Sequence, residues 1–108
     1  MKNSDKIIII KIHNYIEQIQ EFIEGLSLEK FSCDNKTISA CVFNLSQIGE
    51  LVTKFSDEFL ENTQQIPWRK IRGLRNKIVH DYDGIQLTIV WEVITEFLPE
   101  LILELQKL

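Results

Sequence analysis

The residue types best suited to chemistry lie together at residues 75–82, in the run RNKIVHDY. Arg75 offers a permanent planar cation that can hold a phosphate through two hydrogen bonds while negative charge builds on it. His80 can take and give protons near neutral pH, as cleavage of a phosphodiester by an adjacent 2′-hydroxyl requires. The other histidine, His13, lies among polar residues of a predicted helix, and we expect an ordinary surface side chain there. The pattern therefore makes Arg75 and His80 the candidate catalytic pair for phosphodiester cleavage.

Helical geometry limits how these two groups can meet. Positions five residues apart differ by roughly 140° about an ideal helix axis, so Arg75 and His80 do not share a face. Asn76 and His80 do share one, and Arg69 and Arg72 extend the same polar ridge upstream. A symmetric pair of helices would bring an arginine and a histidine from two chains into one cleft, so we expect a homodimer.

The same residues are also compatible with a purely structural role. Arg75 could form an ion pair with Asp81 or Asp83, and His80 could bond a free carbonyl at the end of its helix. Tyr82 could simply cover that helix end. The basic strip could equally be a solvated helix face. On the residue types alone, both interpretations stay open.

Four helices are needed to position this run. Apolar residues recur at three- and four-residue steps, which predicts helices over residues 5–24, 34–61, 67–80 and 86–107. Ser4 or Asp5 is the expected cap of the first helix, and Gly25 is its expected left-handed stop. The third helix should bury Trp68, Ile71, Leu74 and Ile78. Short connections between four helices predict an all-α, antiparallel up-and-down bundle.

Two prolines indicate where the third helix begins and where the fourth helix bends or starts its last turns. Pro67 stands where the first turn of the third helix tolerates a missing N–H. Pro99 falls inside the last apolar pattern and should kink that helix or begin its final turns.

Composition narrows the class of protein further. A chain of 108 residues, 44% of them hydrophobic, fits one domain with a single core, here residues 1–108. Cys33 and Cys41 have neither the spacing of a zinc site nor partners for a disulfide framework, so no metal or other cofactor is expected. The apolar run at residues 7–10 is too short to span a bilayer or to serve as a signal peptide, and we expect a cytoplasmic protein.

Charge is unevenly distributed along the chain. The sequence has 12 basic and 16 acidic residues and a net charge of −4. Residues 67–80 contain no acidic residue but hold a cluster of basic ones: Arg69, Lys70, Arg72, Arg75 and Lys77. An otherwise acidic body with one basic strip can attract a phosphate backbone locally.

The arrangement Arg75-x4-His80-x-Tyr82, with Asn76 after the arginine, resembles the motif of the HepT-like toxins in the HEPN (higher eukaryotes and prokaryotes nucleotide-binding) superfamily. Further matching positions occur in order along the chain: Ile48-Gly49-Glu50, Pro67-Trp68, Ile71-Arg72-Gly73, Val90-Trp91 and Leu98-Pro99. The resemblance therefore covers most of the sequence.

The resemblance implies a helical bundle that dimerises through the motif helix. It also implies a metal-independent ribonuclease that acts as the toxin of a toxin–antitoxin pair. Its antitoxin would be a minimal nucleotidyltransferase of the MntA type, which transfers AMP to the motif tyrosine, here Tyr82.

Carried over residue by residue, the resemblance makes Arg75 and His80 catalytic and gives Asn76 a supporting role. Arg69, Arg72 and Lys77 become candidate RNA contacts. The main alternative is a non-catalytic module of the same fold that binds a nucleotide or the nucleotidyltransferase, and a plain structural dimer is a third hypothesis.

Overall fold

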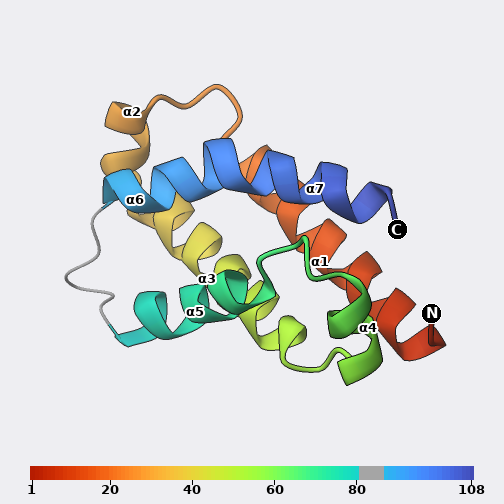
Figure 1. Ribbon diagram of the computed structural model, residues 1–108. Helices are drawn as coiled ribbons and strands as arrows, with labels where there is room; N and C mark the ends of the chain where they lie inside the picture. The colour runs from red at the N-terminus through yellow and green to blue at the C-terminus, as the bar shows by residue number, and fades with distance from the viewer. Residues whose placement is uncertain (81–86) are drawn as a thin grey trace.

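Four long helical segments build the bundle in the computed structural model, which describes residues 1–80 and 87–108 and, for residues 75–80, the backbone alone. The long segments are α1 (Asn3–Phe22), α3 (Asn35–Val52), α5 (Trp68–His80) and a C-terminal segment made of α6 (Leu87–Glu92), the π-helical turn η2 (Val93–Phe97) and α7 (Leu98–Gln106). Short helices α2 (Leu28–Ser32) and α4 (Asp57–Asn62) lie in the connections. Successive long segments run in opposite directions (Figure 1). The predicted all-α antiparallel bundle is confirmed.

The isoleucines of α1 form the first wall of the core. Ile8, Ile12, Ile16 and Ile19 are buried, as their spacing along one helical face predicts. The helix ends at Phe22, and Gly25 has a φ of +76°, a left-handed conformation that glycine adopts without a steric penalty. The predicted stop at Gly25 is therefore confirmed.

The predicted second helix, residues 34–61, is wrong in its length. It is two helices, because α3 ends at Val52 and α4 begins at Asp57. Ser56 caps α4 by accepting a hydrogen bond from the Phe59 N–H through its Oγ, at 3.2 Å. The carboxylate of Asp5 accepts bonds from the Ser56 N–H, at 2.9 Å, and from the Ser56 hydroxyl, at 2.7 Å.

The same interaction explains a second error. Neither Ser4 nor Asp5 caps α1, which begins at Asn3 after Lys2 without a side-chain cap. Asp5 instead lies inside the first turn, 1% exposed, where it holds the start of α4. The connection after α1 also contains the short helix α2, which is capped by Ser27.

One continuous core joins the long helices. Asn44 on α3 is buried and donates to the Tyr15 carbonyl oxygen, at 3.3 Å, and to Oε1 of Gln18, at 3.0 Å, so α1 and α3 are fixed by polar as well as apolar contacts. The helix that carries the motif, α5, packs chiefly against α3. Within residues 1–80 and 87–108, no helix combines the length and the apolar character needed to cross a bilayer.

The last helix is interrupted directly before Pro99, as predicted. The π-helical turn η2 ends at Phe97, and Pro99 is the second residue of α7. A proline lacks the N–H that would bond the carbonyl four residues back, and its ring crowds that carbonyl, so a wider turn before it relieves the conflict. Some apolar side chains of this C-terminal part are exposed, among them Ile89 at 40% and Leu108 at 41%.

Candidate functional site

The helix that carries the motif begins close to its predicted start. The predicted range 67–80 becomes Trp68–His80, with Pro67 just before the helix, where its carbonyl accepts the Ile71 N–H at 3.1 Å. Trp68 and Ile71 are buried as expected, and Leu74 is half-buried against the core. The side chain of Ile78, the fourth expected core residue, lies outside the described residues.

Trp68 anchors the first turn of α5. Its indole N–H donates to the Thr63 Oγ at 2.8 Å, and that hydroxyl donates to the Phe59 carbonyl at 2.7 Å. The indole ring also packs against Phe55 and Phe59, with centroid distances of 4.9 and 5.7 Å. All four side chains are buried, so the position of the basic residues that follow Trp68 is closely fixed.

Arg69 and Arg72 lie on the rim of one hollow, which we call the arginine hollow. Both side chains are exposed, and neither forms an ion pair or hydrogen bond with another described residue. The hollow has a volume of about 470 Å³. Its lining also includes residues of α3, α4 and the connections beside them: Val52, Thr53, Phe55, Asp57, Leu60, Gln64, Ile66, Pro67 and Trp68.

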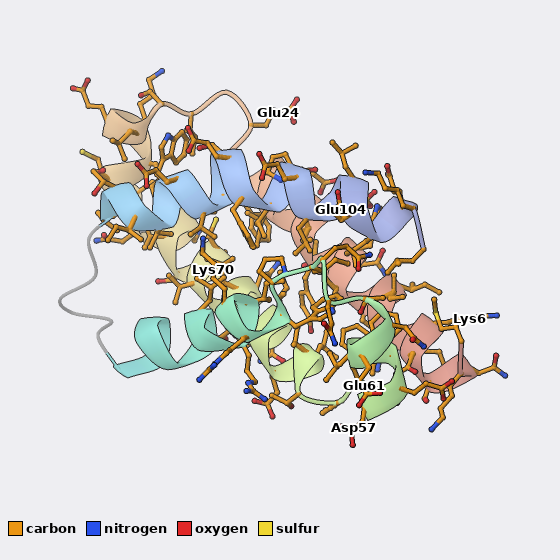
Figure 2. The ribbon with its side chains drawn as sticks, in the orientation of Figure 1. Lys6, Glu24, Asp57, Glu61, Lys70 and Glu104 are labelled. Atoms are coloured by element: carbon orange, nitrogen blue, oxygen red, sulfur yellow. The ribbon has the colours of Figure 1, made fainter. Side chains whose placement is uncertain are left out.

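Lys70 lies on the opposite flank of α5 and is held by the C-terminal segment. Its Nζ lies 5.2 Å from the centroid of the Phe97 ring, a cation–π contact. It points from α5 towards α6, η2 and α7 (Figure 2). A second hollow, of about 280 Å³, is lined there by Lys70 and three carboxylates, those of Glu92, Glu96 and Glu100. The basic strip is therefore split into two flanks with different surroundings.

The backbone of α5 is helical as far as His80, so the motif positions keep regular helical spacing. Asn76 and His80 are one turn apart, while Arg75 and His80 differ by roughly 140° about the axis. The side chains of Arg75, Asn76, Lys77 and His80 lie outside the described residues, and so does all of Tyr82. The described backbone of α5 therefore has no unwound last turn, and Arg75 and His80 do not lie on one face of the helix in one chain.

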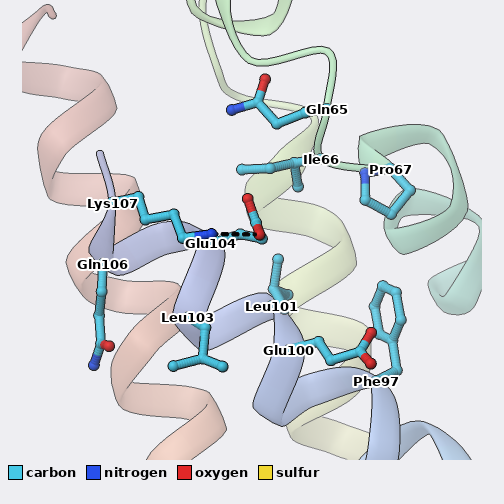
Figure 3. A pocket seen from close by; sticks show the side chains of 10 residues that line it. All are labelled: Gln65, Ile66, Pro67, Phe97, Glu100, Leu101, Leu103, Glu104, Gln106 and Lys107. Atoms are coloured by element: carbon cyan, nitrogen blue, oxygen red, sulfur yellow. Dashed lines mark hydrogen bonds and ion pairs between the residues drawn. The ribbon is translucent and has the colours of Figure 1, made fainter.

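A hollow beside α7 is poorly suited to a polyanion. It has a volume of about 610 Å³ and lies between residues 65–67 and α7 (Figure 3). Glu100 and Glu104 line it, and the one cation among its lining residues, Lys107, bonds Glu104 at 3.1 Å. Sequence reasoning did not identify either this hollow or the arginine hollow, because both are formed by segments that are distant in the sequence.

Comparison with known proteins places the chain in a family. The family model for ribonuclease HepT-like proteins matches residues 12–108. The chain belongs to the ribonuclease HepT-like family. This confirms the resemblance seen in the motif and in the flanking positions of the sequence.

Relatives of similar length support the HepT-like assignment. A protein of Thermococcus cleftensis named as a probable ribonuclease HepT is 34% identical over 108 residues, covering all of this chain and 98% of that protein. A protein of Caldanaerobacter subterraneus subsp. tengcongensis, named as a proposed RNase, is 39% identical over 85 residues. The match covers 79% of this chain and 76% of that protein. A third relative, a protein of Methanocaldococcus jannaschii with a similar name, is 32% identical over 108 residues. The match covers 99% of this chain and 92% of that protein. No solved structure is significantly similar to this HepT-like chain.

Proposed function

We propose that this chain is a metal-independent endoribonuclease and the toxin of a toxin–antitoxin pair. The observation that carries the proposal is the motif Arg75-x4-His80-x-Tyr82 at the end of α5, within a match to the HepT-like family over residues 12–108. Relatives whose names describe them as ribonucleases support the reaction class. The exposed Arg69 and Arg72 on the same helix support an RNA substrate, because guanidinium groups bind phosphate well.

The proposed chemistry is transfer of the phosphodiester to the adjacent 2′-hydroxyl. A base takes the proton of the 2′-hydroxyl, the 2′-oxygen forms a bond to phosphorus, and the 5′-oxygen leaves with a proton from an acid. His80 serves as acid or base, and Arg75 stabilises the charge that builds on the phosphate oxygens. Asn76 orients His80 or the substrate. The products are a 2′,3′-cyclic phosphate and a free 5′-hydroxyl.

We further propose a homodimer in which α5 of each chain contributes to one cleft. Arg75 and His80 fall on different faces of the regular helix α5, so the backbone of one chain does not bring them together. Gly73 lies between Arg72 and Arg75 and has no side chain. The space that a Cβ atom would enter there is open, so a second helix could approach at this position. The cellular site of action would be the cytoplasm, where RNA and a cognate antitoxin are both present.

Substitution of the catalytic pair tests the reaction. We expect His80→Ala and Arg75→Ala to abolish RNA cleavage and relieve growth arrest, with the fold and the oligomeric state unchanged. His13→Ala is the matched control, because His13 is half-buried on α1 beside Glu17, with Nδ1 to Oε1 at 3.4 Å, and should retain full activity. Cleavage should persist in EDTA. Unchanged toxicity in His80→Ala would favour the non-catalytic binding module instead.

Regulation is proposed to act through Tyr82. The partner would be an MntA-type minimal nucleotidyltransferase that transfers AMP to this hydroxyl and so places negative charge and bulk beside His80. We expect Tyr82→Phe to stay toxic when that enzyme is co-expressed. Mass spectrometry should find AMP on the peptide that contains Tyr82 in the wild-type chain, and AMP on another residue would refute this acceptor.

A further inference from the structure

We propose that the arginine hollow binds one nucleotide of a single-stranded RNA, at a position that flanks the bond being cut. This inference rests on the proposed ribonuclease function and adds a substrate subsite to it. The hollow combines two exposed guanidinium groups, those of Arg69 and Arg72, with an open depression of about 470 Å³. That volume lies within the range of small-ligand pockets, roughly 300–1,000 Å³.

The lining matches the parts of a nucleotide. Phe55 and Trp68 line the hollow with only 5% and 7% of their surfaces exposed, so they contribute apolar ring edges that a base can contact. Thr53 and Gln64 are exposed on its rim and can hydrogen-bond to the edge of a base or to a ribose. Among the described residues of the lining Asp57 is the single carboxylate, so the two arginines outweigh it and leave the rim positive.

The position along α5 separates this subsite from the catalytic one. With a helical rise of about 1.5 Å per residue, Arg72 lies about 12 Å and Arg69 about 17 Å from His80 along the axis. Within one chain, a phosphate held by Arg69 and Arg72 is therefore distinct from the phosphate at which His80 gives or takes a proton. It belongs to a neighbouring nucleotide of the same strand.

The charges around α5 favour one path for the RNA strand. On the opposite flank Lys70 is engaged with Phe97, and Glu92, Glu96 and Glu100 line the hollow beside it. Their charge repels a phosphate backbone. The path therefore runs along the flank of Arg69 and Arg72, and an unpaired strand is favoured because its bases are free to enter a pocket.

The first test measures RNA binding in the His80→Ala background, so that the strand is not cut. The probe is a fluorescein-labelled single-stranded RNA of about 12 nucleotides, followed by fluorescence anisotropy over a series of KCl concentrations. We expect Arg69→Gln with Arg72→Gln to weaken binding about tenfold or more. The slope of log affinity against log salt should fall by about 0.7, because the two arginines hold one phosphate and a phosphate contact on a single strand contributes about 0.7.

Two controls separate this site from general charge effects. Lys70→Gln removes one positive charge from the same helix, and its affinity should stay within about twofold of the parent because Lys70 is already engaged. Arg69→Lys with Arg72→Lys should keep most of the salt slope. An equal loss in Lys70→Gln, or no loss in the double glutamine variant, would overturn the proposal.

A second variant tests the hollow itself without changing charge. Gln64→Trp should fill the space and weaken RNA binding several-fold at an unchanged salt slope, whereas Gln20→Trp, the same change on the exposed face of α1, should have no effect. If Gln64→Trp binds as the parent does, no nucleotide occupies the hollow. The ribonuclease proposal is judged separately, by cleavage in the wild-type chain, so an active wild type with unaffected variants refutes the subsite alone.

Discussion

Asp5 carries a negative charge inside the first turn of α1, where 1% of its surface is exposed. Burial by itself raises the pKa of a carboxyl group. The hydrogen bonds from the Ser56 hydroxyl and N–H, with the nearby charges of Lys2 and the N-terminus, nevertheless leave the pKa of Asp5 below its ordinary value. The ionised form is therefore the form that stabilises the fold.

This lowered pKa predicts loss of stability in acid. The contribution of Asp5 is complete above its unfolded-state pKa of about 3.9 and is lost as the pH falls through the lower folded-state value. We expect Asp5→Asn to lower the free energy of unfolding at pH 7 by about 1–3 kcal/mol and to flatten its dependence on pH between about 5 and 2. Urea titrations across that range measure both effects.

The control for this prediction is another aspartate. Asp57→Asn, an exposed change in the first turn of α4, should retain the acid dependence of the wild type. An Asp5→Asn variant that loses stability in acid as steeply as the wild type would show that Asp5 is not responsible. Asp34 contributes in the same direction, because the hydrogen bonds from the Thr37 side chain and N–H lower its pKa.

The two cysteines predict a selective modification. Cys41 is fully buried, and burial, with a smaller effect of the Asp34 charge, raises its pKa to about 11. Cys33 is exposed. Since the thiolate is the reactive form, iodoacetamide at pH 8 should label Cys33 in the native protein and leave Cys41 unmodified until the chain unfolds. Peptide mass spectrometry measures the alkylation of Cys33 and of Cys41 over time. Equal labelling rates would contradict the buried position of Cys41.

At the scale of elements, the start of α5 depends on a buried hydroxyl. Thr63→Val keeps the size of the side chain but removes the acceptor of the Trp68 indole N–H. We expect it to cost about 1–3 kcal/mol of unfolding free energy, because a buried donor is left without a partner. RNA cleavage should also fall, since Trp68 fixes the helix that carries the proposed site.

A matched substitution is available for comparison. Like Thr63, Thr95 donates its hydroxyl to the carbonyl four residues earlier, here that of Trp91, but it lies on an exposed surface and accepts no bond from an indole. Thr95→Val should cost no more than about 0.5 kcal/mol. Thermal unfolding of the two variants compares them directly, and similar losses would mean that burial of the Trp68–Thr63 pair is not what matters.

Local sequence signals predicted the parts of the fold that depend on local physics. The isoleucine spacing in α1, the glycine after it and the prolines at residues 67 and 99 each correctly indicated an element or its end. The break between α3 and α4 was missed because Ser56 is held by Asp5, 51 residues away. Apolar residues continue in helical steps through this region, so the pattern alone could not reveal a cap that depends on a distant carboxylate.

The same distinction applies to the candidate site. The sequence predicted exposed arginines at residues 69 and 72, and the structure places both there. The sequence did not predict the hollow that these arginines line, because α3, α4 and the connection before α5 also form that hollow. The different surroundings of Lys70 could not be read from the chain either, since Phe97 reaches it only through the fold. The roles of Arg75, Asn76, Lys77, His80 and Tyr82 stay predictions.

At the scale of the whole molecule, the proposed dimer should divide the catalytic pair between two subunits. The backbone of α5 puts Arg75 and His80 on different faces of one helix, so we expect one cleft to take the arginine of one subunit and the histidine of the other. Arg75→Ala and His80→Ala homodimers should both be inactive. A heterodimer of these two variants, purified through two different affinity tags, has one intact combination and should show about half of the wild-type activity.

The reciprocal heterodimer makes this test decisive. A wild-type subunit paired with an Arg75→Ala/His80→Ala subunit keeps both groups on one chain, and each pairing of an arginine with a histidine across the interface then lacks one of them. If the groups act across the interface, this heterodimer is inactive while the mixed single-variant heterodimer cuts RNA. The opposite result, activity in the wild-type pairing and none in the other, would show that one chain supplies a complete site and that the spacing along α5 does not require a second subunit.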